Sequence, residues 1–215
     1  MLLLTAAACT TDADDGPQGP LPDSRYDFVT YEGYGQGEAR FQYVGRDDST
    51  AISLTAAMSE APKDLADGQR VLLNYQVLER LSATAWQVRV NYINSGNVAS
   101  DSLRVGTLPL PQWPIRVRSL WRSGAYLNLR AEVEWTGKPR RLMLVADSST
   151  LQADTVHCYL VHDLMQADTT YFWRNCYGSF FVGNLMKKPT CRVMRVHVAD
   201  VVRPEATTYD FSIKY

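Results

Sequence analysis

Residues 108–135 read LPLPQWPIRVRSLWRSGAYLNLRAEVEW, and this stretch decides the fold. Its second half alternates without a break, so one side of an extended chain carries Leu127, Leu129, Ala131, Val133 and Trp135. The opposite side carries Asn128, Arg130, Glu132 and Glu134. A period of two predicts a β-strand with one face in a core and the other face in water.

The first half of the same stretch holds three prolines, Pro109, Pro111 and Pro114. Neither a helix interior nor a central strand accepts prolines at this density. A proline-rich joint followed at once by a new core strand predicts the start of a second domain. We therefore expect a leader and flexible acidic tether over residues 1–22, a first domain over 23–107 and a second domain over 108–215.

The composition of the 215 residues favours a sheet-rich protein with packed cores. Apolar residues make up 46% and charged residues 21%, and there are 12 Tyr, 5 Trp and 6 Phe. Aromatic and β-branched residues are typical of strands rather than helices. No apolar run approaches the ~20 residues of a membrane-spanning helix.

Charge is divided unevenly along the chain, although the net charge is only −1. Residues 24–107 carry 8 Lys and Arg against 10 Asp and Glu, whereas residues 108–215 carry 14 against 9. A basic excess is typical of a solvated surface, and it also suits an acidic partner such as an anionic glycan or a lipid headgroup. The acidic balance of the first domain argues against nucleic acid as a partner, because such binding needs a basic groove.

The first domain is predicted to contain strands at residues 26–31, 40–44, 51–57, 69–79 and 86–93, with residues 98–105 closing the sheet. Residues 62–68 can hold about one helical turn, closed by Gly68. Gly33, Gly35 and Gly37 lack the spacing and the following helix of a nucleotide-binding loop, so they indicate a hairpin. Five or six short strands, with one helical turn between the third and the fourth, suit a small closed barrel of the OB type.

The second domain is predicted to contain strands at residues 115–121, 126–135, 141–146, 155–162, 170–182, 192–202 and 209–215. Turn residues separate these strands at regular spacing. About seven antiparallel strands in ~105 residues indicate a β-sandwich. The predicted fold class is therefore all-β, with an OB-like barrel followed by an antiparallel β-sandwich.

The chain begins with apolar residues followed by small ones, which is typical of the end of a secretory signal peptide. The small residues Ala7 and Ala8 directly before Cys9 resemble the lipobox of bacterial lipoproteins. That resemblance implies that Cys9 takes a diacylglyceryl group and becomes the new N-terminus. Ala6 stands where leucine is usual and no Lys or Arg precedes the apolar run, so we expect the true start to lie upstream. An ordinary N-terminal segment is the alternative.

Residues 10–22 form a flexible tether by composition, because they are rich in Pro, Gly and Asp and lack apolar periodicity. Asp12, Asp14 and Asp15 follow the cysteine closely. They resemble the acidic export signal of surface-exposed Bacteroidetes lipoproteins, and a solvated acidic linker is the alternative. The resemblance implies a protein held on the outer membrane and exposed at the cell surface.

Three further cysteines, Cys158, Cys176 and Cys191, lie in the second domain. Export permits disulfides, but three thiols allow at most one bridge. No C-x-x-C spacing occurs, which argues against a zinc or redox site. Free thiols buried in strands are the favoured interpretation, and one bridge is the alternative.

Four stretches carry a resemblance to a family, the NigD-like lipoproteins of Bacteroidetes. These stretches are Gly68-Gln69-Arg70-Val71, residues 121–129 (WRSGAYLNL), residues 159–163 (YLVHD) and residues 174–180 (RNCYGSF). Together with the order of lipobox, acidic tether, barrel and sandwich, the resemblance covers nearly the whole chain after Cys9. The family name comes from a bacteriocin-associated operon, so the resemblance implies an immunity role as one function. It implies no catalytic residue.

Candidate chemistry is sparse. His157 and His162 are five residues apart, so in one regular strand they point to opposite faces and cannot share a metal ion unless His197 approaches. Glu132 and Glu134 lie ~7 Å apart on one strand face, a spacing that suits glycoside hydrolysis but is ordinary on an exposed face. We predict no catalytic residues, no metal and no cofactor.

The barrel is the better candidate for binding, because OB surfaces bind oligonucleotides and oligosaccharides. Tyr34 and Trp86 are candidate stacking residues, together with Phe41, Tyr43 and Tyr92, although most of these aromatics are expected in the core. The sequence favours a lipid-anchored envelope protein with a non-enzymatic binding or structural role. Its expected partners are the membrane, through the lipid anchor, and an envelope protein or glycan. A bacteriocin-associated immunity lipoprotein is the alternative, and an unrecognised hydrolase is the third.

Overall fold

A computed structural model describes residues 24–46, 50–96, 98–135, 140–164, 172–203 and 208–213. Cys9 and the three aspartates Asp12, Asp14 and Asp15 lie outside the described residues. The described part is built almost entirely of strands, with one short helix, α1 (Gly183–Met186), and one 3-10 turn, η1 (Ser148–Thr150). None of its helices has the length or the apolar character needed to span a bilayer.

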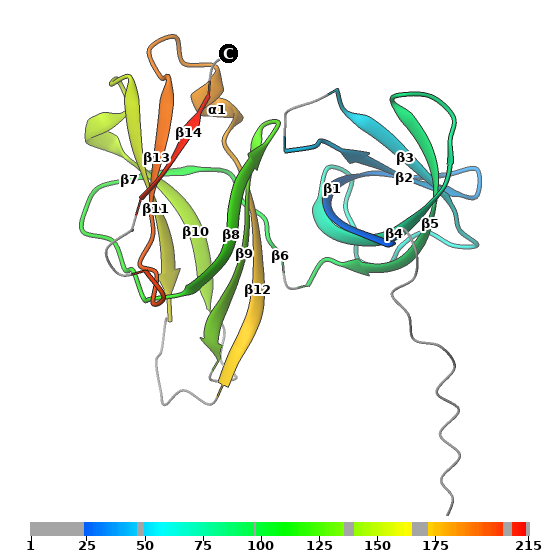
Figure 1. Cartoon of the computed structure of the whole chain (residues 1–215), viewed down its shortest axis with the longest axis horizontal. Helices are drawn as coiled ribbons and strands as arrows, with labels where there is room; N and C mark the ends of the chain where they lie inside the picture. The colour runs from blue at the N-terminus through cyan, green and yellow to red at the C-terminus, as the bar shows by residue number, and fades with distance from the viewer. Residues whose placement is uncertain are drawn as a thin grey trace, which may run out of the picture.

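The first unit is a closed five-stranded barrel (Figure 1). Its strands are β1 (Ser24–Gly35), β2 (Glu38–Tyr43), β3 (Ile52–Ala57), β4 (Arg70–Arg80) and β5 (Ala85–Asn94). They close in the order β1-β2-β3-β5-β4, with β3 and β5 parallel and the other pairs antiparallel. Phe41, Leu54 and Tyr75 are fully buried inside it. The predicted OB-like barrel is confirmed.

The second unit is a sandwich of two sheets around one core (Figure 1). One sheet has the order β14 (Thr208–Ser212), β13 (Val193–His197), β11 (Thr155–Asp163), β10 (Arg141–Asp147) and β7 (Arg104–Gly106). The other has the order β6 (Val98–Ala99), β12 (Phe172–Phe181), β9 (Tyr126–Trp135) and β8 (Arg116–Ser123). Leu129 of β9 and Leu144 of β10 are both fully buried in the shared core. The predicted sandwich is confirmed.

Strand directions in the sandwich are mixed, so the expected antiparallel pairing holds for only part of the two sheets. The long neighbours β8, β9 and β12 pair antiparallel, as do β10 with β11 and β13 with β14. The pairs β6–β12, β7–β10 and β11–β13 are parallel. The shorter strands thus join the sheets through crossovers that the alternation of single strands does not reveal.

Two sequence predictions in the first unit are wrong. Residues 98–105 do not close the barrel, because β1 and β4 pair with each other and complete it. Instead, β6 pairs with β12 and β7 pairs with β10. Residues 62–68 form turns instead of a helical turn. There Gly68, at φ +82°, donates its N–H to the Tyr31 carbonyl, and the Tyr31 N–H donates to the Gln69 carbonyl at 2.8 Å, which draws this segment onto the β1 ladder. The boundary between residues 107 and 108 stays a prediction.

The alternation of β9 is confirmed on its inner face and wrong on part of its outer face. The inner residues Leu127, Leu129 and Ala131 belong to the sandwich core. On the outer face, Asn128 has no exposed surface at all. The barrel covers it, so this part of the face lies at an interface between the two units rather than in water.

A buried arginine of the barrel lies at the centre of this interface. Arg70, only 6% exposed, donates from Nε to Ser179 Oγ at 2.9 Å and from Nη2 to Asn128 Oδ1 at 3.3 Å. Its Nη1 donates to Thr30 Oγ1 of its own unit at 3.1 Å, and its guanidinium lies 4.1 Å from the Tyr126 ring centroid. Burial lowers the pKa of Arg70 to about 10, which still leaves it charged at neutral pH. The two units are therefore joined by a polar network as well as by packing.

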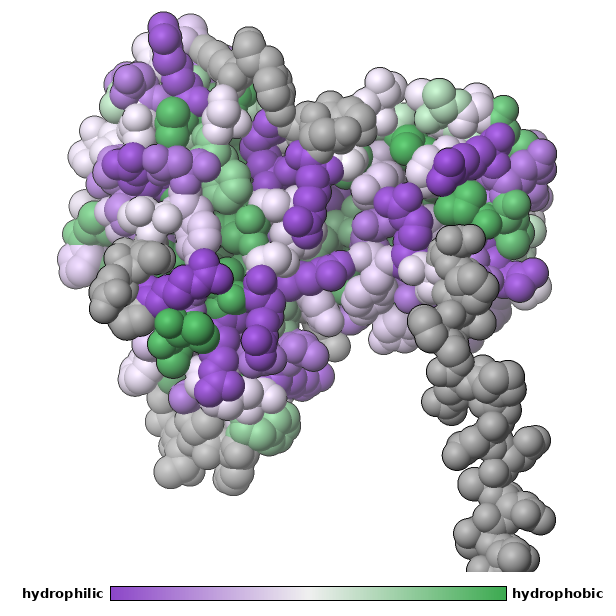
Figure 2. Space-filling model, viewed as in Figure 1, coloured by the Kyte–Doolittle hydropathy of each residue, from purple (hydrophilic) through white to green (hydrophobic). Residues whose placement is uncertain are grey.

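Contacts around this network extend the junction along β1. Arg130 of β9 donates from Nη2 to the Tyr26 carbonyl at 2.6 Å, and the Phe28 and Trp121 rings lie 5.6 Å apart between centroids. On the face drawn in Figure 2 the two units form two lobes that join along part of their sides, with polar side chains spread over both. The first strand of the barrel thus packs directly on the four-stranded sheet of the sandwich.

Candidate ligand-binding site

Four inward-pointing positions at one end of the sandwich break its apolar pattern. The inward-pointing residues of β9 include Leu129, Ala131 and Val133, and the series ends in Trp135. On the facing sheet, the inward series of β11 passes from Leu160 to His162. Alternate positions before Leu144 of β10 lead back to Arg140. On β12 the inner series that includes Cys176 continues to Arg174. An aromatic ring and three basic side chains therefore line the end of the core, where the two sheets face each other.

These four residues surround a pocket of about 330 Å³. Its apolar walls include Val98, Val133 and Leu142. A second hollow of about 240 Å³ shares Arg140 and His162 and is bordered by Trp113 and Glu134. A concave space with mostly apolar walls and a few convergent polar groups is the usual form of a small-molecule site.

His162 is held in one tautomer by its two neighbours. Its Nε2 lies 3.3 Å from Arg140 Nη1, and its Nδ1 lies 3.3 Å from the Trp113 carbonyl oxygen. Arginine only donates, so Nε2 accepts and Nδ1–H donates to the carbonyl. Burial and the neighbouring Arg140 charge lower the pKa of His162. The imidazole is therefore neutral at pH 7 and serves to position Arg140.

The guanidinium of Arg140 forms hydrogen bonds through only part of its donors. Its Nε and Nη2 are buried and find no hydrogen-bond partner among the described residues. Burial lowers its pKa, and the Glu134 charge partly opposes that effect. Both Arg140 and Arg174 lie against the Trp135 ring, with guanidinium carbons 5.9 Å and 4.6 Å from its centroid. The pocket is thus lined by basic side chains, and two donors of Arg140 have no hydrogen-bond acceptor among the described residues.

Neither a protein-family profile nor a curated protein matches the sequence of this chain. Solved structures match it in fold. A NigD-like immunity protein from Bacteroides caccae superposes with a TM-score of 0.60 over 90% of this chain and 94% of that one, at 21% identity. The chain has the NigD-like fold.

Two other structures agree with that result. A Bacteroides fragilis protein that is described as a lipoprotein superposes with a TM-score of 0.62 at 10% identity, with 89% of this chain and 99% of that chain covered. A protein of unknown function from Bacteroides vulgatus has a TM-score of 0.66 at 18% identity, with 89% and 90% covered. The expected resemblance to the NigD-like lipoproteins is confirmed in both units of the fold.

The aromatic residues predicted for binding lie in the barrel of this NigD-like fold, away from the pocket. Trp86 is 8% exposed and belongs to the barrel core, with the Arg25 and Arg80 guanidiniums 5.3 Å and 5.1 Å from its ring centroid. Tyr34 packs against the same core and donates its hydroxyl to the Met58 carbonyl at 3.0 Å. Tyr92 is the exposed member of the aromatic group, at 57%. A binding role for Tyr34 and Trp86 stays a prediction.

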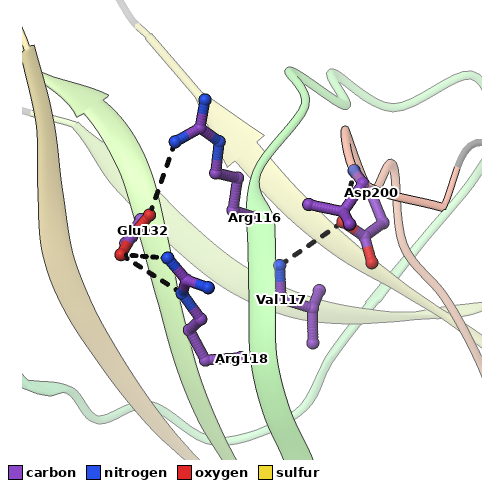
Figure 3. A network of polar contacts seen from close by, with 6 residues as sticks. Arg116, Val117, Arg118, Glu132 and Asp200 are labelled. Atoms are coloured by element: carbon purple, nitrogen blue, oxygen red, sulfur yellow. Dashed lines mark hydrogen bonds and ion pairs between the residues drawn. The ribbon is translucent and has the colours of Figure 1, made fainter.

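The two glutamates of β9 do not face each other across an open cleft. Figure 3 shows Glu132 between two arginines of β8. Arg118 Nη2 lies 2.7 Å from Glu132 Oε1, and Arg116 Nη1 lies 3.7 Å from Glu132 Oε2. Glu134 lies beside the second hollow, bordering it with Arg140. Glu132 therefore takes part in cross-strand ion pairs of the kind that support a sheet.

Figure 3 also shows how the chain after β13 is attached to this sheet. Asp200 is 3% exposed, and its Oδ1 accepts from the Val117 N–H at 3.4 Å and from the Val202 N–H at 3.0 Å. The Ile115 N–H donates to the Ala199 carbonyl at 2.9 Å. This attachment holds the start of β8, and with it the segment that contains Trp113, next to the C-terminal part of the sandwich.

The histidines follow the predicted register. His157 lies on the outer face of β11 and His162 on the inner face, so they point apart as expected. His197 does approach His157, with 2.9 Å between His157 Nδ1 and His197 Nε2. Among the described residues no three His, Cys, Asp or Glu side chains gather as a metal site would need. The pair stacks with Tyr159 on the outer face of the five-stranded sheet, and none of the three residues lines the pocket.

The three cysteines of the sandwich are free thiols, as predicted. Only Cys158 is also buried in a strand, because Cys176 is half-buried in β12 and Cys191 is buried just before β13. Cys176 lines the pocket, and burial raises its pKa to about 12. Burial likewise raises the pKa of Cys158 to about 12. At neutral pH both thiols are protonated and act as small apolar groups rather than nucleophiles.

Sequence reasoning missed Arg140, Arg174 and Trp135 as a site. The signal was present in the alternation itself, because polar residues occupied positions that continue an inward series. His162 carried the clearest signal, since it occupies the same face of β11 as Val156, Cys158 and Leu160. Pairing of the strand ends was the missing information.

Proposed function

We propose that this protein is a lipid-anchored cell-envelope protein that binds a small ligand, or a small group on a larger partner, without transforming it. The single observation that carries the binding role is the basic, aromatic-walled pocket at the end of the sandwich. Its volume of about 330 Å³ is near the lower end of the range of ligand pockets.

The anchoring part of the proposal rests on Cys9 and its small neighbours Ala7 and Ala8. The description of the Bacteroides fragilis structure as a lipoprotein supports it. We further propose that Asp12, Asp14 and Asp15 direct the protein to the outer face of the outer membrane. A tether that begins at Cys9 would then join the membrane to β1.

The non-enzymatic part rests on how the candidate groups are engaged. Glu132 is neutralised by two arginines, and both nitrogens of His162 are taken by Arg140 and Trp113. A general acid or base needs a lone pair or proton directed at a substrate. Neither group offers one, which supports recognition rather than proton transfer.

The anchor is tested by changing Cys9→Ser in the full-length gene product. The variant should move from the membrane fraction to the soluble one and lose incorporated labelled fatty acid. Each buried methylene of an acyl chain contributes ~0.8 kcal/mol, so losing the chains removes the attachment. A protein that stays in the membrane fraction without the cysteine would overturn this part.

The binding role is tested by thermal-shift screening of neutral and charged envelope sugars and short peptides. A bound ligand raises the melting temperature by mass action. Trp135→Leu, which removes the aromatic wall, should abolish the shift, whereas Tyr92→Leu, which alters an exposed ring on the barrel, should keep it. A shift that survives Trp135→Leu would place binding elsewhere.

An immunity role is the alternative, and the likeness to the Bacteroides caccae immunity protein favours it. If immunity rests on binding a toxin protein over an interface of standard size, single changes in a small pocket should matter little. Cells lacking the gene would become sensitive to a toxin encoded beside it. Restoration of resistance by Trp135→Leu would favour the alternative over the pocket.

A further inference from the structure

The unpaired edge of Arg140 has the geometry of a carboxylate receptor. In a guanidinium, Nε–H and one N–H of Nη2 point the same way along one edge and bind both oxygens of a carboxylate. In Arg140 these are the two nitrogens that lack a partner, while Nη1 is engaged by His162. The two donors without a partner therefore lie together on the one edge that binds carboxylates.

The same protein contains this edge in its occupied form. Arg195 of β13 donates from Nε to Asp210 Oδ1 and from Nη2 to Asp210 Oδ2, each at 2.7 Å. That pair lies at the surface and joins β13 to β14. Arg140 has the equivalent two donors beside a pocket, and they find no hydrogen-bond acceptor among the described residues.

Burial makes the missing partner costly. A buried donor without an acceptor costs about 1–3 kcal/mol, and more when the group is charged. His162, neutral and fixed in its tautomer, adds one hydrogen bond but no negative charge. An anion bound along the free edge would supply the two missing acceptors and a negative charge in addition to that of Glu134.

We propose that the pocket takes a small carboxylate, whose two oxygens bind Nε and Nη2 of Arg140 while its body lies against Trp135, Val133 and Leu142. This rests on the proposed function, that the pocket is a binding site. A carboxylate fits better than a phosphate, because two oxygens match two donors and a phosphate brings a further oxygen and more charge. Such a group occurs on sugar acids and at peptide C-termini, and the chemistry at Arg140 is the same for both.

The free edge is buried, so a ligand has to displace a lining side chain before it reaches Arg140. Association should therefore be slower than for an open site. Arg174 contributes positive charge at the same pocket and should raise affinity for the anion without replacing the two-point contact.

Isothermal titration calorimetry on the whole soluble chain tests the proposal with two carboxylates, D-glucuronate and N-acetylalanine. Their uncharged amide analogues, glucuronamide and N-acetylalaninamide, serve as ligand controls. At least one carboxylate should bind and its amide analogue should not. Glucuronate alone would assign the pocket to a sugar acid, N-acetylalanine alone to a peptide terminus, and both to a site that reads only the carboxylate.

Protein variants locate the contact. Arg140→Lys keeps the charge but loses the two-point edge, so affinity should fall about tenfold or more. Arg195→Lys alters the occupied edge at the surface and should leave affinity unchanged. Circular dichroism checks that both variants are folded.

Four results would overturn the proposal: no binding by either carboxylate, equal binding by an uncharged amide analogue, unchanged affinity in Arg140→Lys, or binding of inorganic phosphate alone. A neutral sugar that binds in the thermal-shift screen and depends on Trp135 would keep the proposed function while removing the carboxylate. The two failures are therefore distinguishable.

Discussion

Two arginines, Arg70 at the junction of the units and Arg140 at the end of the sandwich, show two outcomes for a guanidinium taken out of water. Every nitrogen of Arg70 has an acceptor, on Thr30, Asn128 and Ser179. Only one nitrogen of Arg140 has a partner among the described residues. Neither donates to a carboxylate in those bonds, although the Glu134 charge acts on Arg140.

The two arginines differ in how many of their nitrogens have hydrogen-bond partners. A fully satisfied polar network fixes one arrangement, and its loss is costly because several groups are left unpaired together. A partly satisfied one costs stability and is retained where it has another use. The comparison therefore predicts that Arg70 contributes to the folded state and that Arg140 contributes to binding.

The largest effect is expected from Arg70→Met. The change removes three hydrogen bonds and leaves Ser179 and Asn128 with fewer partners inside the interface, so the free energy of unfolding should fall by about 3 kcal/mol. Urea unfolding followed by circular dichroism measures the loss. A change below about 1 kcal/mol would show that the network is incidental and would remove one side of the comparison.

A smaller loss is expected from Asn128→Ala. Its Oδ1 accepts from Arg70 and Ser179, and its Nδ2 donates to Ser123 Oγ at 2.8 Å. We expect a loss of about 2 kcal/mol, because Arg70 keeps two of its bonds. Asn175→Ala on the neighbouring strand β12 is the control, since Asn175 is exposed and should change stability by less than about 0.5 kcal/mol. Equal losses would mean that the barrel does not cover β9 in solution.

The dependence of stability on pH should report on His162. Burial and Arg140 lower its pKa in the folded state below the ordinary value of 6.5. The unfolded chain then takes up the proton more readily, so the stabilisation is complete above pH 6.5 and is lost as pH falls toward the lowered pKa.

Urea unfolding at several pH values between 5 and 7.5 measures this loss. His162→Gln, which keeps an acceptor for Arg140, should flatten the decline in stability. The pKa of His197 is also lowered, by burial first and then by His157 and Arg195, so His197→Gln serves as a second variant that removes only its own share. An unaltered decline in His162→Gln would show that the imidazole is not held neutral.

The smallest effect on stability is expected at Arg140. Arg140→Met removes one hydrogen bond to His162 and also removes two unpaired donors, so the two contributions should nearly cancel, within about 0.5 kcal/mol. Urea unfolding beside Arg70→Met makes the comparison direct. A loss as large as that of Arg70→Met would mean that Arg140 is structural and would end the contrast.

Local alternation predicted most of the fold. The period of two located β4, β5, β9 and β11 to within a residue or two, because long strands with one buried face carry a strong signal. The two-residue strand β6 has no period to detect, and its pairing with β12 depends on chain closure far along the sequence. Pairings of this kind follow from topology rather than from local pattern.

The candidate site could be predicted only in part. Alternation shows that His162 points inward, but it does not show which side chain meets it from the facing sheet. The same limit applies to Asn128, because a polar residue on an outer face is compatible with water and with a covering domain. In both cases the deciding contact joins elements that are distant in the sequence.

The position of β1 has a mechanical consequence. This strand follows the predicted tether, pairs with β2 on one side and β4 on the other, and touches the sandwich through Phe28 and Trp121. If Cys9 holds the protein to a membrane, a pull on that anchor acts along β1. Hydrogen bonds perpendicular to a strand share such a pull as a shear rather than opening one after another. Force from fluid flow or from a held partner would then pass through the barrel into the sandwich while both remain folded.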